Sequence, residues 1–342
     1  MSKKLLIIIF LMILCTGCSS DGDKKQVNIL NWSSYIPSEV ILEFEKETGI
    51  EVNYGTYSSN EELLAKVSVA KEGTYDLIFP SDYMVEIMIS RGLIQEMDIS
   101  KLDNVGNLNL NFLGKDYDSE NEYTLPFIAA STVIAVNRDV ISDDITSYND
   151  LLNSKYKNEI VLIDDQRIII GMALLANGYD MNSTNSKELE VAKKWLLKLK
   201  ENLKAYDSDS PKNFLISGEA SIAVLWNAEG ALASMENSNI ENIFPEEGVA
   251  LSIDNFAIPK GAKNEDELYE FIDYILEPSV MAKIIGSYPY KTVNVASEEL
   301  LSYEYLSNAA ANISDDVFDN GLFVKNIGSS ISMYDRLWAE IK

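Results

Sequence analysis

The sequence contains no histidine and almost no cysteine. Its 342 residues include two cysteines, Cys15 and Cys18, both near the start of the chain. Without histidine the chain cannot form a Ser-His-Asp triad, a Cys-His pair or an HExxH zinc site. Beyond Cys18 it has no thiol, so the rest of the chain forms no internal disulfide. Among enzymes, these absences leave mechanisms built on carboxylates or lysine.

Basic residues are also scarce. The chain has 28 Lys and Arg against 54 Asp and Glu, which gives a formal net charge of −26. Proteins that bind nucleic acid need clustered Lys and Arg to displace counterions from phosphates, and this sequence has no basic run. We therefore expect no nucleic-acid partner, and the acidic excess favours cationic or neutral ligands.

The composition is nevertheless that of a folded protein. Apolar residues make up 46% of the chain and aromatic residues 10%, whereas disordered chains combine low hydrophobicity with high net charge. At about 150 residues per domain, the length indicates two domains.

Both cysteines belong to a short N-terminal segment. Lys3 and Lys4 precede a ten-residue apolar run over 5–14, which is long enough for the apolar part of a signal peptide and too short to span a bilayer. The run leads to the sequence TGC, whose last residue is Cys18. This sequence resembles the lipobox of bacterial lipoproteins, although Cys15 stands where that motif usually carries leucine.

This segment predicts an exported lipoprotein. We expect a signal peptide over 1–17, a lipidated Cys18 and a polar tether over 18–26. No later apolar stretch approaches 18 residues. The predicted location is the periplasm or the cell surface, with the lipid on the outer face of the cytoplasmic membrane and a membrane contact through Cys18.

Strand and helix patterns alternate from Val27 onward, which predicts an α/β fold with mostly parallel sheets covered by helices. Strands are expected over 27–31, 50–54, 75–79, 159–163 and 221–226, and helices over 38–48, 59–70, 83–90, 167–176 and 189–203. Ser38 is expected to cap the first helix and Gly49 to end it, and a capping box that begins at Ser59 is expected to open the second. Two further strand-like runs, 131–137 and 251–259, are candidates for extended segments that cross between two halves.

In open α/β sheets, ligands bind beyond the carboxyl ends of the strands. Aromatic and acidic residues recur at these positions and in the crossing run: Trp32-Ser33-Ser34-Tyr35, Pro80-Ser81-Asp82-Tyr83, Asp164-Asp165, Trp226 with Glu229, and Asp254. Carboxylates accept charge-assisted hydrogen bonds from ammonium groups, and ring faces attract cations and cover methylene groups. This combination predicts a site for a flexible amine.

From Val27 to the C-terminus the chain resembles the spermidine/putrescine-binding subunits of ABC transporters. The resemblance rests on NWSSY at 31–35, YDLIFPSDY at 75–83, DDQR at 164–167, GMAL at 171–174, LWN at 225–227, DNFAIP at 254–259, and YPY at 288–290 with Asn294. It implies a two-lobed periplasmic-binding-protein fold of type II, with a first lobe over 27–130 and 254–298 and a second over 131–253 and 299–342.

The resemblance also implies roles for single residues, each named here by its position in this sequence. It implies aromatic walls formed by Trp32, Tyr35, Tyr83 and Trp226, and a polar contact from Ser81. It also implies that the amine is bound by two acids, Asp165 and Asp254, and it matches Glu229 to an acid present in putrescine-preferring members. Ser33 is included as a further ligand contact, and either Tyr288 or Tyr290 is expected to close the remaining side.

The chain departs from the family pattern at four positions. Ser34 stands where Asp or Glu is common, Ile168 where the family has Glu, Ser252 where some members have Trp, and Val324 where Gln is expected. A missing acid leaves an ammonium group without its counter-charge. The sequence therefore favours putrescine over a triamine such as spermidine, and leaves the choice between them open.

The expected function is capture of a polyamine between two closing lobes and its delivery to an ABC permease. We expect no enzyme activity, no cofactor and no metal, and a monomer. The sequence leaves other functions open: binding of another small ligand such as a different amine, an amino acid, a sugar or a ferric complex; an extracellular carboxylate-based glycosidase; or a surface adhesin.

Overall fold

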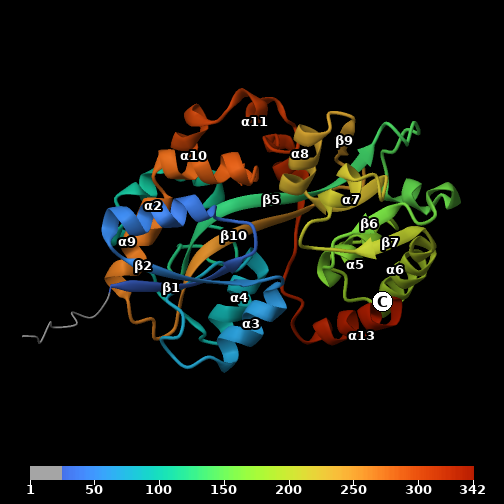
Figure 1. The fold of residues 1–342 in the computed structure, drawn as a ribbon. Coiled ribbons are helices and arrows are strands. Elements are labelled where there is room, and N and C mark those ends of the chain that lie inside the picture. The colour runs from blue at the N-terminus through green and yellow to red at the C-terminus, as the bar shows by residue number, and fades with distance from the viewer. Residues whose placement is uncertain (1–24) are drawn as a thin grey trace, which may run out of the picture.

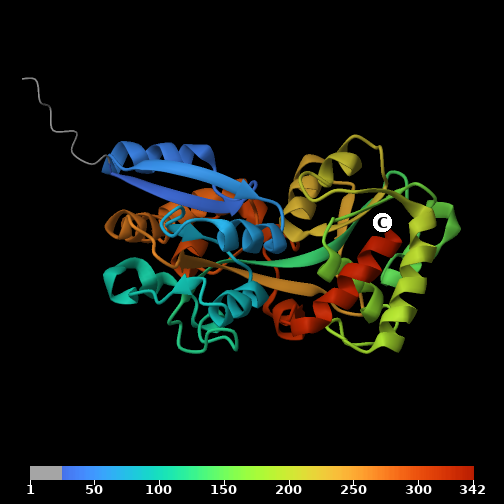
Figure 2. The ribbon, with the colours of Figure 1, turned by 90° about the horizontal axis from the view of Figure 1, so that it is seen from below.

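The computed structural model of the chain describes residues 25–342 and has two lobes joined by long strands (Figures 1 and 2). The expected signal peptide, Cys18 and nearly all of the tether lie outside the described residues. Within this range no helix has both the length and the apolar character needed to cross a membrane.

The first lobe contains the three strand-helix pairs that the sequence predicts. They are β1 (Gln26–Trp32), α2 (Ser38–Thr48), β2 (Glu51–Tyr57), α3 (Asn60–Val69), β3 (Leu77–Ile78) and α4 (Asp82–Ser90). The strands β2 and β3 both pair parallel with β1. Together with α9 (Glu265–Ile275) and α10 (Pro278–Ser287), α2 lies on one side of these strands, and α3 and α4 lie on the other (Figure 1).

The ends of these helices follow from local sequence. The Oγ of Ser59 accepts the Glu62 backbone N–H at 3.1 Å, which satisfies a free donor in the first turn of α3. Gly49 ends α2 with a φ of +73°, a conformation that costs glycine little. The expected cap at Ser38 is wrong by one position, because Pro37 precedes the helix and Ser38 is its first residue.

The second lobe is built from β6, β7, β8 and β9 and the helices around them. Its elements are β6 (Ile160–Leu162), α5 (Gln166–Leu175), α6 (Ser186–Leu199), β7 (Leu203–Tyr206), α7 (Lys212–Ile216), β8 (Ile222–Trp226), α8 (Asn227–Glu236), β9 (Ile240–Ile243) and α13 (Ile331–Ile341). The predicted helix over 189–203 is wrong at its end, since α6 stops at Leu199. Buried Asn202 donates to the carbonyls of Leu151 and Asn153 at 2.8 and 2.9 Å, which holds the chain out of the helix before β7.

Two long strands cross between the lobes, as expected, and they make the sheet mixed. These are β5 (Thr124–Asn137) and β10 (Ala250–Pro259), which pair antiparallel with each other. The first part of β5 pairs with β10 and the second part with β8 and β9. The strand order is β2-β1-β3-β10-β5-β8-β6-β7. The outer strands of each lobe are parallel, whereas the crossing strands are antiparallel to their neighbours in this order.

A third segment also runs between the lobes, after α11 (Tyr303–Ser307) and through β12 (Leu322–Phe323), which pairs with β10. Tyr305 Oη donates to the Tyr290 carbonyl at 2.9 Å, and Asn308 Nδ2 donates to Ser234 Oγ of α8 at 3.0 Å. The residues around α11 therefore contact both lobes, whereas the sequence assigns 299–342 to the second lobe.

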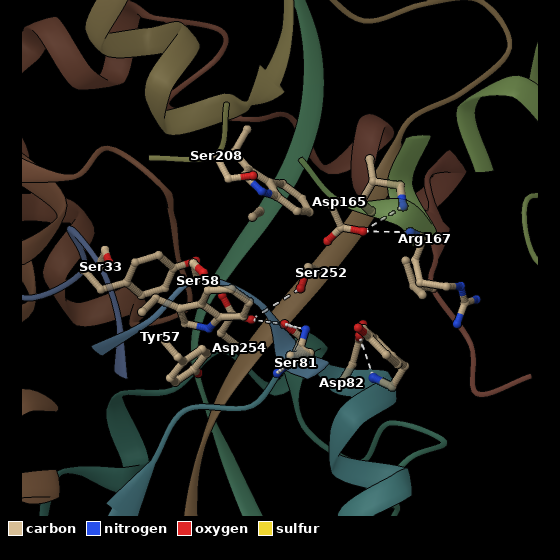
Figure 3. Close-up of a pocket in the computed structure, with 18 of the residues that line it drawn as sticks. Ser33, Tyr57, Ser58, Ser81, Asp82, Asp165, Arg167, Ser208, Ser252 and Asp254 are labelled. Carbon is tan, nitrogen blue, oxygen red and sulfur yellow. Dashed lines mark hydrogen bonds between the residues drawn. The ribbon is translucent and has the colours of Figure 1, made fainter. Parts of the chain in front are cut away.

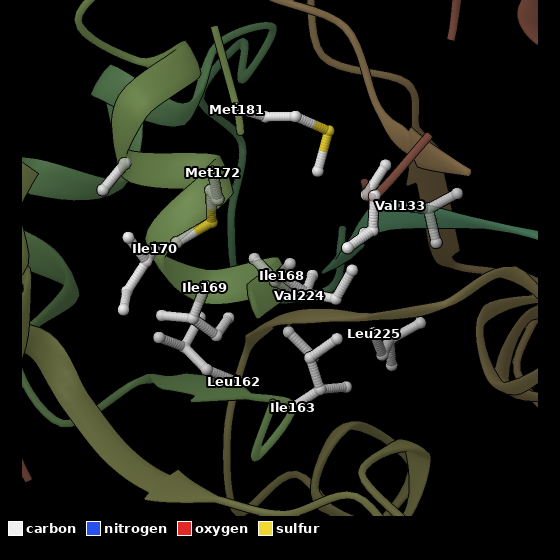
Figure 4. Close-up of a cluster of buried hydrophobic side chains, with 14 of the residues drawn as sticks. Val133, Leu162, Ile163, Ile168, Ile169, Ile170, Met172, Met181, Val224 and Leu225 are labelled. Carbon is white, nitrogen blue, oxygen red and sulfur yellow. The ribbon is translucent and has the colours of Figure 1, made fainter. Parts of the chain in front are cut away.

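Helix α5 is almost entirely buried, and this burial fixes its place in the second lobe. Its residues from Arg167 to Leu175 are all buried, so no face of the helix is left for solvent. Figure 4 shows its isoleucines and Met172 among residues of β5, β6 and β8, such as Val133, Leu162 and Val224. This packing holds the N-terminus of α5 beside the junction of the lobes.

Candidate functional site

A pocket lies between the two lobes, at the carboxyl ends of strands from both of them (Figure 3). Its lining residues are Trp32, Ser33, Tyr35, Tyr57, Ser58, Asn60, Ser81, Asp82, Tyr83, Ala130, Asp165, Arg167, Ile168, Ser208, Asp209, Trp226, Ser252, Asp254, Tyr290 and Val324. The pocket thus lies where the positional rule for α/β sheets predicts a ligand site.

Asp254 is the most deeply placed acid that the sequence analysis assigned to this site. It is 3% exposed, and its two oxygens accept from Tyr35 Oη and Ser81 Oγ, each at 2.6 Å. Ser252 Oγ lies 3.4 Å from Oδ1. Between Asp254 and Asn255 the pairing of β10 with β5 shifts register, and such irregularities redirect a side chain. Burial raises the pKa of Asp254 to about 6, and the hydrogen bonds from the three hydroxyl groups oppose this shift.

Aromatic rings of the first lobe form one wall of the pocket. The rings of Trp32 and Tyr57 are 4.7 Å apart, and those of Tyr35 and Tyr290 are 5.0 Å apart. Trp32 Nε1 and Tyr57 Oη both donate to the Phe79 carbonyl, at 3.0 and 2.5 Å. Their polar atoms are thereby satisfied, so the ring faces are free to cover the methylene groups of a ligand.

The second lobe supplies another acid, Asp165, and the indole of Trp226. Asp165 is half-buried and precedes α5, where its Oδ1 accepts the backbone N–H groups of Arg167 and Ile168 at 2.8 and 3.0 Å. Burial raises its pKa, and these two hydrogen bonds oppose the shift. Trp226 stands at the carboxyl end of β8, directly before α8. Together these residues face the first lobe with one carboxylate and one indole.

Arg167 is a buried cation in the pocket wall, where its Nη2 is bonded and its Nε has no hydrogen-bond partner among the described residues. Its guanidinium donates to Asn182 Oδ1 at 3.0 Å and to the Lys325 carbonyl at 2.9 Å. It also lies over the rings of Tyr83 and Tyr334, with centroid distances of 5.6 and 5.1 Å. These contacts make Arg167 a link between α4, α5 and the C-terminal segment.

The structure brings most of the residues named from the sequence into one pocket. Those that line it are Trp32, Ser33, Tyr35, Ser81, Tyr83, Asp165, Trp226, Asp254 and Tyr290. Of the two tyrosines that the sequence left open, Tyr290 lines the pocket and Tyr288 does not. Glu229 does not line it either, and both of its oxygens accept from Lys212 Nζ at 3.1 Å.

Three of the four departures from the family pattern also lie in this wall. Ile168, Ser252 and Val324 line the pocket, and all three are buried. Ser34 is exposed, is absent from the lining, and has a φ of +56° in the turn after β1. Ile168 and Val324 therefore make their part of the wall less polar, whereas Ser252 places a hydroxyl group where some members have an indole.

Several lining residues were not named as site residues. Tyr57, Ser58 and Asn60 follow or end β2, whose carboxyl end the positional rule could have indicated. Ser208 and Asp209 follow β7, a strand that was not predicted and that begins at Leu203, the last residue of the predicted helix. Asp82 lies between two residues that were named.

Within residues 25–342, no group of three or more acidic, cysteine or histidine side chains is placed to hold a metal ion.

The chain was compared with known proteins. Residues 39–312 match the family model described as bacterial extracellular solute-binding protein. The chain is 36% identical to the spermidine/putrescine-binding periplasmic protein of Escherichia coli over 321 residues, which are 94% of this chain and 92% of that protein.

Solved structures agree with this match. The fold resembles a Listeria monocytogenes protein described as a candidate spermidine/putrescine ABC transporter, with a TM-score of 0.89, 33% identity, and coverage of 93% of this chain and 98% of that one. A lipoprotein of Treponema pallidum has a TM-score of 0.83 at 27% identity, covering 93% of this chain and 99% of that one. The chain therefore belongs to the bacterial extracellular solute-binding proteins.

Proposed function

We propose that this chain captures a polyamine in the pocket between its lobes and delivers it to an ABC permease. The observation that carries this proposal is Asp254, a buried acid bonded to Tyr35 and Ser81 in a pocket walled by aromatic rings. A carboxylate with aromatic neighbours suits an ammonium group on a methylene chain. The polyamine-binding relatives and the aligned sequence motifs support the same ligand class.

The charge of the pocket wall supports a cation over an amino acid. An amino-acid receptor needs a cationic side chain for the ligand carboxylate. One cation, Arg167, lies in this lining, and its Nη2 is already bonded to Asn182 and Lys325. Four acids line the pocket with it: Asp82, Asp165, Asp209 and Asp254. The acids Asp165 and Asp254 come from opposite lobes. A ligand with ammonium groups at both ends would contact both acids and so favour the closed arrangement.

The mechanism that follows is closure and transport, with no bond made or broken. The crossing strands β5 and β10 connect the lobes, and bending there would bring the two walls together. Exclusion of water strengthens each ion pair in the closed pocket. The permease would recognise the closed form.

We also propose the cellular setting that the N-terminal sequence predicts. The chain is exported, loses residues 1–17, and is held at the membrane by a lipid on Cys18. It acts as a monomer. The lobe division proposed from the sequence is kept, with the residues around α11 as a junction between the lobes.

The test is Asp254→Asn, measured by titration calorimetry with putrescine and spermidine. Removing one partner of a buried charge pair costs about 2–5 kcal/mol, so the affinity for both amines should fall by at least about thirtyfold. Far-UV circular dichroism should be unchanged, because Asn keeps the side-chain shape.

Amino acids and oligosaccharides serve as comparison ligands in the same titration. Putrescine and spermidine should stabilise the wild-type chain against heat, and these comparison ligands should not. Unchanged amine affinity in Asp254→Asn, or tighter binding of a comparison ligand, would refute the proposed function.

A further inference from the structure

One acid of the pocket wall has no role in the site as described so far. Asp82 is the first residue of α4 and is 3% exposed. Its Oδ1 accepts the Tyr83 backbone N–H at 2.8 Å, and the Ile253 backbone N–H also faces its carboxyl group and lowers its pKa. Its Oδ2 has no partner within hydrogen-bond distance among the described residues. Buried carboxyl oxygens are nearly always bonded, so an unpaired one in a ligand pocket indicates a donor that comes with the ligand.

The position of Asp82 supports this reading. It lines the pocket together with Asp165 and Asp254, and Figure 3 shows its carboxyl group among the pocket side chains. Burial is the largest influence on Asp82 and raises its pKa well above its usual range, so the carboxyl group is costly to ionise without a nearby cation. Asp254 on β10 repels the charge of Asp82, and Arg167 on α5 attracts it. Burial and the charge of Asp82 both raise the pKa of the Tyr117 phenol.

The number of acids in the wall decides which amine the pocket can neutralise. Glu229 was expected as the third acid, but Lys212 neutralises it outside the wall. Asp165 and Asp254 alone match the two charges of a diamine. Asp82 supplies a third enclosed carboxyl group, while Asp209 is exposed at the rim.

We infer that Asp82 receives an ammonium group of the bound amine and lets the pocket hold a linear triamine, and not only a diamine. This inference rests on the proposed function, and it specifies that the bound polyamine can carry three ammonium groups. It reverses the preference for putrescine that the sequence departures favoured, because those departures were counted without Asp82.

The experiment is Asp82→Asn in the full chain, titrated with spermidine and putrescine. The amide side chain of this variant would keep an oxygen for the Tyr83 N–H and lose only the charge. The affinity for spermidine should fall at least tenfold, whereas that for putrescine should change less than about threefold. An equal change for both amines, or an unchanged spermidine affinity, would overturn the inference.

A second variant and a matched control keep the result interpretable. Asp82→Ser also offers an oxygen near the Tyr83 N–H and should give the same selective loss if Asp82→Asn folds poorly, as judged by circular dichroism. Asp266→Asn removes an exposed aspartate from the first turn of α9, outside the pocket, and should leave both affinities unchanged.

The two proposals fail in different ways. If the wild-type chain bound neither amine, the proposed function would be refuted. If it bound both amines and Asp82→Asn lost no selectivity for spermidine, only the role of Asp82 would be refuted.

Discussion

At the scale of single residues, the pocket acids differ in what burial does to them. Burial raises the pKa of Asp254 to about 6, although hydrogen bonds from three hydroxyl groups lower it. Among the described residues, its hydrogen-bond partners are these hydroxyl groups. Glu229 has Lys212 beside it, and this cation lowers the pKa that burial raises. An enclosed acid without its own cation is the one that gains most from a cationic ligand.

The raised pKa of Asp254 predicts that amine affinity depends on pH. Amine binding needs the carboxylate, so affinity should be constant above pH 7 and fall roughly tenfold per pH unit below 6. Calorimetric titration with putrescine between pH 5 and 8 measures this slope. Constant affinity across that range would contradict the assignment of Asp254 as the ammonium partner.

The same shift has the opposite sign for the stability of the ligand-free chain. Between the usual value of 3.8 and about 6, folded Asp254 holds a proton more tightly than unfolded Asp254. Its contribution to stability is therefore present below pH 4 and is lost as the pH rises through 6. Urea unfolding of Asp254→Asn should show a weaker decline of stability across this window than the wild-type chain does.

Single residues also show how far the sequence could predict the site. Trp32, Ser81 and Tyr290 could be named because motifs and strand ends mark them. Glu229 could not be excluded, since its partner Lys212 lies on a different helix and only the fold brings the two together. Asp82 was not predicted as a site residue for a related reason: the neighbouring residues in the sequence do not show that one of its oxygens is buried without a hydrogen-bond partner.

At the scale of elements, Asp165 serves both its helix and the pocket. Its Oδ1 caps α5 by accepting two backbone N–H groups, and the cap also fixes where the carboxylate points. The apolar burial of α5 then holds this end of the helix at the junction of the lobes. One side chain thus links the stability of a helix to the charge of the site.

Two substitutions at Asp165 should separate these roles. Asp165→Asn keeps a capping oxygen and loses the charge, whereas Asp165→Ala loses both. We expect weaker amine binding in both variants, but an additional loss of about 0.5–2 kcal/mol in unfolding free energy only in Asp165→Ala. Urea unfolding and calorimetry measure the two effects. Equal stability of the two variants would show that the cap does not stabilise α5.

Element boundaries were predictable where local chemistry sets them. The cap at Ser59 and the left-handed Gly49 are local features, and they were identified correctly. The start of β7 at Leu203 is not local, because the segment becomes a strand by pairing with β6. Ser208 and Asp209 were missed with it, since their place in the pocket depends on that strand.

At the scale of the whole molecule, each lobe contributes one part of the pocket. The aromatic wall and Asp254 belong to the first lobe, and Asp165, Arg167 and Trp226 belong to the second. Asn326 Nδ2 also donates to Glu86 Oε1 at 3.2 Å between the C-terminal segment and α4. Ligand contacts to both walls would therefore act on the same interface as these protein contacts.

The proposed lipid on Cys18 determines where the whole molecule is located, and this location can be tested in cells. Cys18→Ser should move the exported full chain from the membrane fraction to the soluble fraction, because a lipid can no longer be attached. Cys15→Ser is the matched control and should remain with the membranes. Detergent phase partition measures both variants, and membrane retention of Cys18→Ser would refute lipidation at this residue.

The sequence by itself determined the α/β class, the family and the strand ends that carry the pocket, because apolar periodicity, caps and motifs are local. Only the tertiary structure decided which acids line the pocket. The crossing strands β5 and β10 bring distant segments together, so Lys212 can neutralise Glu229 while Asp82 is buried without a partner for its Oδ2. Pairing and burial between distant residues set the free energy of a charge, and neither can be read from neighbours in the chain.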